Sequence, residues 1–212
     1  MNREPVAVAI VEAPVEAGDD YVDPIDEGDL GNPLPPPTPH KRDGFFLSLQ
    51  PALAYLYLSQ RGADLKVTGF GFGFDFLIGG SLDEGLHLGA VLGGASFPTP
   101  DLKAQGATVA NNTDLNSFHV GAAMDYYLDP EGGLHLLGEL GYAQLSGSGS
   151  LVEPQTLQGV GLCAGLGYDA WVSDNWSLGA LGRLTFSPLH HKQADTNHWL
   201  LLPTLNFTAT YH

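Results

Sequence analysis

The stretch that decides the fold is residues 67–80, which read VTGFGFGFDFLIGG. Large apolar side chains occupy every second position, and small or acidic residues stand between most of them. The apolar set is Phe70, Phe72, Phe74, Phe76 and Ile78, and the opposing set is Gly69, Gly71, Gly73 and Asp75. Because successive side chains of a β-strand point to opposite faces, this period of two predicts a strand with one apolar and one small, polar face.

The same period recurs from residue 44 to the last residue. A run at 44–58, GFFLSLQPALAYLYL, precedes the quoted one, and six more follow at 86–93, 118–126, 134–143, 160–169, 176–186 and 199–211. Three short connections, SLDEG, DPEGG and SDN, alternate with four mostly longer ones centred near residues 62, 105, 149 and 192. Short and long connections alternate in this way when the two ends of an up-and-down barrel face different compartments. The chain is therefore predicted to be all-β, an eight-stranded antiparallel up-and-down barrel over 44–212.

The apolar face of this barrel is predicted to point outward, into lipid. Lipocalin-like and avidin-like soluble barrels also alternate, but in such a barrel the outer face here would be Gly, Ala, His and a few acids, almost without Lys. Charged residues make up only 15% of the chain, against about 25% in an ordinary soluble domain. Aromatic residues are expected in two girdles at the membrane interfaces. One girdle is Tyr55, Tyr57, Phe118, Tyr142, Phe186 and Trp199, and the other is Phe45, Tyr126, Tyr168, Trp176 and Tyr211.

Residues 1–43 are predicted to be a disordered linker. They carry ten Asp or Glu against three Lys or Arg and include PLPPPTP at 33–39, a composition that cannot bury a core. The formal net charge of −16 argues against nucleic acid as a partner. No run reaches the ~18 unbroken apolar residues of a membrane-spanning helix. A barrel would need a secretory signal, and we expect one that this sequence does not include.

Residues 44–212 resemble the small outer-membrane barrels of the OmpA transmembrane domain, OmpX/Ail and OmpW type. The strand pattern, the turn alternation and the Gly-rich inner face carry this resemblance. It implies a bacterial outer-membrane protein whose partners are outer-membrane lipid and, during biogenesis, the barrel-assembly machinery. Barrels of this family commonly end on an aromatic residue that serves as an assembly signal, and here Tyr211 is followed by His212. We expect a monomer.

Two groups of inward residues stand out. Glu139 and Arg183 are both expected at mid-barrel, where an unpaired charge is costly. The resemblance suggests that they form a structural ion pair, and a gate for ions or solutes is the alternative. A second group is expected near the periplasmic rim and consists of His87, Asp125, His135 and Asp169. Such residues could bind zinc, but their spacing matches no metal motif, so a hydrated polar network is predicted.

Other candidate residues are given structural roles. His190, His191 and His198 lie in or beside the last exterior loop, where an adventitious metal site is conceivable. The single Cys163 excludes an intramolecular disulfide and is expected to fill interior space. No cofactor, no metal and no catalytic residue is assigned.

The predicted function is a structural or surface-interaction role for exposed exterior loops, without enzyme activity. One alternative is a lipid A-modifying barrel enzyme, for which Ser117 and His119 share an inward face without an obvious acid. The other is an OmpW-like narrow channel for small apolar solutes. Inward leucines argue against an open aqueous channel, and these are Leu56, Leu77, Leu137, Leu181, Leu200 and Leu202.

The seam between the first and last strands is predicted to contain a break or bulge. Pro51 and Pro203 fall inside these two strands, and proline cannot donate a ladder hydrogen bond.

Overall fold

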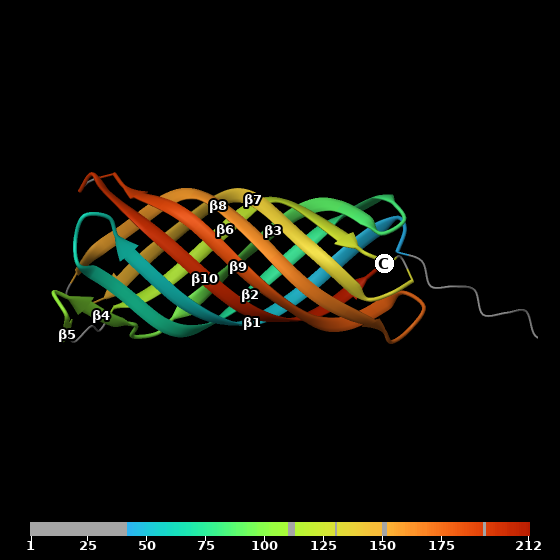
Figure 1. Ribbon diagram of the computed structural model, residues 1–212, viewed down its shortest axis with the longest axis horizontal. Helices are drawn as coiled ribbons and strands as arrows, with labels where there is room; N and C mark the ends of the chain where they lie inside the picture. Colours follow the sequence, from blue (N-terminus) through green and yellow to red (C-terminus); the bar gives the residue numbers. More distant parts are fainter. Residues whose placement is uncertain (1–41, 110–112, 130, 150–151, 193) are drawn as a thin grey trace, which may run out of the picture. The chain divides into compact units, whose positions relative to one another are not determined.

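The computed structural model describes residues 42–109, 113–129, 131–149, 152–192 and 194–212 (Figure 1). Within these ranges every regular element is a β-strand, and no helix there is long and apolar enough to cross a membrane. The strands are β1 (Phe45–Gln60), β2 (Leu65–Asp83), β3 (Leu86–Phe97), β4 (Asp101–Ala104), β5 (Ala107–Val109), β6 (Asp114–Tyr127), β7 (Leu134–Gly149), β8 (Val152–Trp171), β9 (Trp176–His191) and β10 (Thr196–Tyr211). The linker predicted over 1–43 lies outside the described residues, except for Arg42 and Asp43.

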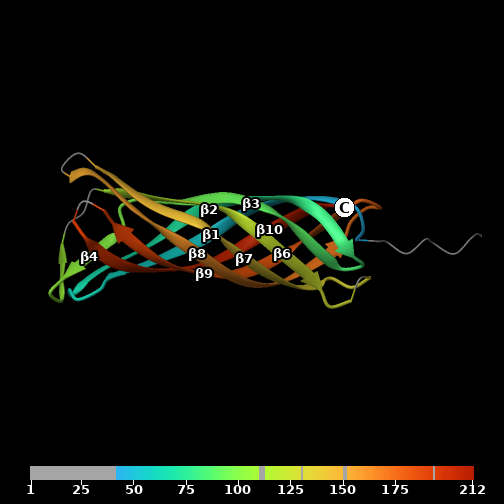
Figure 2. The same ribbon diagram turned by 90° about the horizontal axis from the view of Figure 1, so that it is seen from above.

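Eight of these strands form a closed antiparallel barrel in sequential order, β1-β2-β3-β6-β7-β8-β9-β10, and β10 pairs back onto β1. The predicted eight-stranded up-and-down barrel is therefore confirmed. The hairpin of β4 and β5 was not predicted, and it extends the sheet beyond the wall by pairing β4 with the start of β2. Figure 1 and Figure 2 show this hairpin at the end of the barrel opposite the C-terminus.

The short connections gather at the end that also holds the C-terminus. The turn between β2 and β3 is the tightest, because β2 continues to Asp83 and β3 starts at Leu86. Gly85 adopts a φ of 84° there, a left-handed conformation that glycine accepts without steric cost. The backbone N–H of Glu84 donates to Asp83 Oδ1 over 2.8 Å, which fixes the start of the turn.

The seam between β1 and β10 is interrupted, as predicted. The ladder joins Leu49 to Ala209, skips Gln50 and Pro51, and resumes at Ala52. A second gap lies where β1 faces Pro203. The register is the same on both sides of each gap, so each is a local break and not a bulge.

A third gap was not anticipated. The ladder between β8 and β9 stops after Gly159–Leu189 and resumes at Leu162–Phe186, and Pro188 lies in the interval. In each of the three places a proline without an N–H coincides with the lost pairing.

The outer surface of the wall is apolar, as the membrane interpretation requires. Phe70 and Phe72 expose 79% and 70% of their surface, and apolar side chains on every barrel strand are exposed in the same way. Aromatic residues mark both rims, for example Trp176 and Phe186 on β9 and Tyr211 on β10. The rims are about ten to twelve residues apart, which at ~3.3 Å per residue and a tilt of ~40° gives about 25–30 Å. This height matches the apolar band of a transmembrane barrel.

Candidate functional site

An ionic centre lies at mid-height inside the barrel. Arg183 from β9 donates through Nη2 to Glu139 Oε2 of β7 over 2.6 Å, and through Nη1 to the carboxylate of Asp75 on β2. All three side chains are buried. The structure thus brings together Glu139 and Arg183, the two residues selected from the sequence, and adds Asp75, which the sequence analysis placed on the inner face without a partner.

Further polar groups surround this centre. Asn206 Nδ2 donates to the Asp75 carboxylate over 3.1 Å, and His119 Nε2 lies 3.3 Å from its other oxygen. The thiol of Cys163 accepts from Arg183 Nε at 3.5 Å, so this residue contacts the ionic centre in addition to filling space. One guanidinium therefore pairs with two carboxylates, and Asn206, His119 and Cys163 occupy the outer positions.

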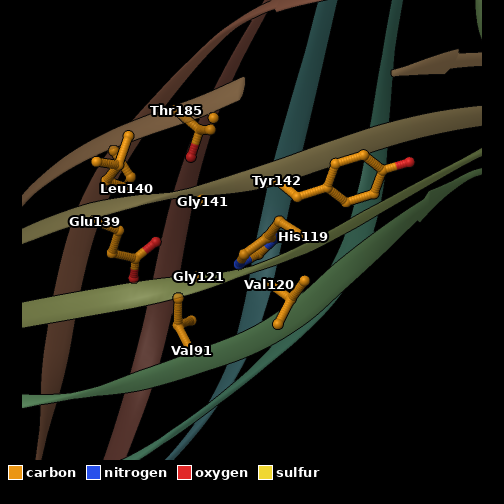
Figure 3. A pocket seen from close by; sticks show the side chains of 11 residues that line it. Val91, His119, Val120, Gly121, Glu139, Leu140, Gly141, Tyr142 and Thr185 are labelled. Carbon is orange, nitrogen blue, oxygen red and sulfur yellow. The ribbon is translucent and has the colours of Figure 1, made fainter. Parts of the chain in front are cut away.

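A small cavity adjoins the centre. Its volume is about 20 Å³, and glycines on three adjacent strands, Gly121, Gly141 and Gly161, form part of its wall. Figure 3 shows Glu139 and His119 around this space. The Oε1 atom of Glu139 is buried and has no hydrogen-bond partner among the described residues. A volume of this size holds about one water molecule, which would solvate that oxygen.

The second predicted group divides into two parts. His135 Nδ1 lies 2.7 Å from Asp125 Oδ1, and its Nε2 is 3.9 Å from Asp169 Oδ1. Asp169 also accepts a 2.9 Å hydrogen bond from the hydroxyl of Tyr127. His87 stands apart, 3.2 Å from a backbone carbonyl oxygen. Within the part of the chain that the structure describes, no three His, Cys, Asp or Glu residues are arranged to hold a metal ion.

The residue that sequence reasoning missed is Arg42. It is 1% exposed, and its guanidinium carbon lies 4.0 Å from the ring centre of Tyr127 and 4.7 Å from that of Trp171. The guanidinium donates to the carbonyl oxygens of Gly132 and Asp169, and the Arg42 carbonyl accepts from Ser81. These contacts place a cation between two aromatic rings inside the end of the barrel that carries the short turns.

His212 belongs to the same end. Its ring is 4.9 Å from Trp171, and its Nε2 is 3.0 Å from Ser177 Oγ. Burial, reinforced by the positive charges of Arg42 and of protonated His87 and His135, lowers the pKa of His212 to about 3. This histidine is therefore neutral at physiological pH.

Apolar layers close the lumen on both sides of the ionic centre. The layer on the side of the short turns is Phe46, Leu77, Val91, Ala123, Leu137 and Leu181. The layer on the side of the β4–β5 hairpin is larger and includes Ala54, Leu56, Leu58, Val67, Phe97, Ala143, Leu145, Leu157, Leu189, Leu200 and Leu202. All six leucines predicted to face inward belong to these layers and are buried.

Ser117 and His119, the residues considered for an enzyme active site, are not joined in a Ser–His–acid arrangement. Ser117 Oγ accepts from the backbone N–H of Ala95 over 3.0 Å and lies 3.4 Å from its carbonyl oxygen. His119 is directed to Asp75, which supplies the acid that the sequence did not reveal. The cavity beside Ser117 and His119 has a volume of about 10 Å³, too small for a lipid or a sugar.

The three histidines near the β9–β10 connection do not form one cluster. His191 and His198 are buried, whereas His190 lies on the other face with 44% of its side chain exposed. His191 Nδ1 accepts from the backbone N–H of Ala194, and His198 Nε2 is 3.1 Å from Thr196 Oγ1.

A closed eight-stranded wall, an apolar outer surface between aromatic rims and a filled interior define the class of small outer-membrane β-barrels, as the sequence pattern predicted. The solved structure of Neisserial surface protein A shares this fold, with a TM-score of 0.56 and 17% identity over 79% of this chain and 96% of that one. Two more outer-membrane proteins are similar at 14% identity. OprG of Pseudomonas aeruginosa has a TM-score of 0.49 and covers 82% of this chain and 98% of its own. Ail of Yersinia pestis has a TM-score of 0.46 and covers 78% of this chain and 99% of its own. No family model matches the sequence, and no curated protein matches it.

Proposed function

We propose that this chain is a bacterial outer-membrane barrel with a closed lumen, whose role is structural or is performed by the loops at its exterior end. The observation that carries this proposal is the filling of the lumen. A solute crossing the barrel would have to displace two buried apolar layers and the ionic centre of Arg183, Asp75 and Glu139. Such a barrel has only its outer surfaces left for function.

The same packing favours this role over the two alternatives. A narrow apolar path would have to pass the ionic centre, where Arg183 bridges β2 and β7. A lipid A-modifying enzyme would need its nucleophile at the lipid surface, whereas Ser117 is turned inward onto a backbone carbonyl. We therefore assign Glu139 and Arg183 a structural role and assign no catalytic residue.

The proposed setting follows from the outer surface. The apolar band would contact outer-membrane lipid, and the barrel-assembly machinery would insert the chain. We also propose that the barrel is a monomer. The end with the β4–β5 hairpin would face the exterior, and the end with the short turns and Arg42 would face the periplasm.

Conductance tests the closed lumen. The protein is reconstituted into a planar lipid bilayer, and heat-modifiable migration in gels shows that it is folded. We expect no unit conductance steps, because no continuous aqueous path crosses the two apolar layers. Regular steps from the folded protein would contradict the proposal.

Protease accessibility tests the orientation. One epitope is inserted at Gly106, in the exposed turn between β4 and β5, and a matched one at Asp174, in the turn between β8 and β9. On intact cells the protease should cleave at Gly106 and leave the Asp174 epitope whole until the outer membrane is permeabilised. The reverse pattern would place the hairpin in the periplasm.

A further inference from the structure

Two lysines face each other on the exterior extension of the sheet. The pairing of β2 with β4 sets Lys66 directly opposite Lys103. Their neighbours Val67 and Leu102 are also paired and face the exterior apolar layer, so both lysines point outward, and both are exposed. Like charges directly opposite each other on antiparallel strands are destabilising.

The structure provides no counter-charge for this pair. Within the described ranges, neither ammonium group has a carboxylate within ion-pair distance. Asp101 is on the same face but is two positions from Lys103 and pairs with Thr68. The pair is therefore a site of excess positive charge.

The exposed bases are confined to one end of the barrel. Among the described residues they all lie at the exterior end and are Arg61, Lys66, Lys103 and Lys192. The turns at the opposite end carry acids, which are Asp83, Glu84, Asp129, Glu131 and Asp174. The exterior end carries exposed acids as well, which are Asp64, Asp101, Asp114 and Asp195, so the excess positive charge is local to the lysine pair.

The depth of the pair matches that of lipid headgroups. Lys66 is four residues beyond Phe70, an exposed aromatic whose ring contacts that of the girdle residue Tyr55. This places Lys66 about 10 Å above the Phe70 ring at ~3.3 Å per residue and a tilt of ~40°. Ser59 of β1 pairs with both Lys66 and Trp199, so the lysine is also two strands from a girdle tryptophan. Headgroups occupy the zone just outside the hydrocarbon core, and long lysine side chains reach into it.

We propose that Lys66 and Lys103 together bind the phosphate of an outer-leaflet lipid headgroup. The inference rests on the outer-membrane position proposed above and adds a ligand class to it. A phosphate between the two ammonium groups accepts hydrogen bonds from both and removes their repulsion. The barrel would thus hold one anionic lipid at a fixed position beside β2 and β4.

The test compares Lys66→Gln/Lys103→Gln with Arg61→Gln/Lys192→Gln, a control that removes the same charge from the same end. Each protein is folded in a neutral detergent with no added lipid, with diphosphorylated lipid A, or with lipid A stripped of its phosphates. The urea midpoint is measured in each case, and native mass spectrometry measures the fraction that retains the lipid. Excess inorganic phosphate is a further arm, which distinguishes a free anion from a lipid-borne one.

The proposal predicts that adding lipid A reverses the order of stability of the wild type and the Lys66→Gln/Lys103→Gln variant. Without lipid, Lys66→Gln/Lys103→Gln should unfold at a higher urea concentration than the wild type, because the repulsion is gone. With diphosphorylated lipid A, the wild type and the control should gain stability and retain the lipid several-fold more than the pair variant does. Lipid A without phosphates and free phosphate should have no such effect.

Three results would overturn the proposal. They are equal retention by the pair variant and the wild type, equal effects of the two forms of lipid A, and a full effect of free phosphate alone. Cell fractionation tests the proposed outer-membrane location separately. A protein found elsewhere would contradict that location, and this result is distinct from one that contradicts lipid binding by the lysine pair.

Discussion

Replacing Arg183 with methionine should lower the free energy of unfolding more than the loss of any other single charged side chain in the barrel. In the folded protein one guanidinium is paired with both Asp75 and Glu139, so the centre carries a formal charge of −1. Arg183→Met fills much of the same space but leaves two buried carboxylates and a charge of −2. Breaking a buried pair typically costs about 3–5 kcal/mol, and the water-sized cavity beside Glu139 favours the lower part of that range.

The matched variant is Glu139→Gln. It leaves Arg183 paired one to one with Asp75, so the centre becomes neutral and the amide can still accept a hydrogen bond. The expected cost is about 1 kcal/mol or less. The double variant Arg183→Met/Glu139→Gln should recover part of the loss, because one carboxylate is removed.

Urea unfolding in lipid vesicles measures these differences, with the fluorescence of the three tryptophans as the signal. Migration in gels before and after heating confirms that each variant folds. If Arg183→Met is as stable as the wild type, or if Glu139→Gln costs as much as Arg183→Met, the charge argument is refuted.

Three more changes test other parts of the interior. Arg42→Ala should lower the free energy of unfolding by about 2–4 kcal/mol, since two cation–π contacts and buried hydrogen bonds are lost, and the urea midpoint measures this. Gly167→Ala should cost about 1–3 kcal/mol, because a Cβ there would overlap the ring of His135, whereas a Cβ at Gly138 has no neighbour within 4 Å and Gly138→Ala should be near neutral. The pKa of His212 is lowered from 6.5 to about 3, so the unfolded chain binds the extra proton between these values. Stability should fall as pH drops from 6.5 towards 3, and His212→Gln should flatten that decline in urea titrations at several pH values.

The strand pattern could be predicted because it is local. Within each strand, alternation assigns every side chain to the lipid face or the lumen face. Phe70 and Gly71 can therefore be assigned without knowledge of the rest of the chain. The number of strands and the closure of the first onto the last follow from repetition of that pattern.

Which side chains meet inside the lumen depends on how far the strands are shifted relative to one another along the barrel axis. The alternation of residues within one strand does not reveal this shift. Asp75 was placed on the inner face, but its meeting with Arg183 depends on how far β2 and β9 are shifted along the barrel axis. The same holds for His119 and Asp75, which belong to strands that are not adjacent.

Arg42 was missed for a different reason. It precedes the first alternating residue and adjoins an acidic, proline-rich stretch, so composition assigned it to the linker. Its aromatic partners, Tyr127 and Trp171, come at the ends of two distant strands. The β4–β5 hairpin was missed because its strands are only four and three residues long, too short to show a period.

The burial of Arg42 also implies an order in which parts of the barrel form. Its carbonyl partners are 90 and 127 residues away along the chain, so the binding site for its guanidinium exists only after β6, β7 and β8 have formed. Contacts that form after the transition state slow unfolding without speeding folding. We therefore predict that Arg42 extends the lifetime of the folded barrel and leaves its rate of folding unchanged.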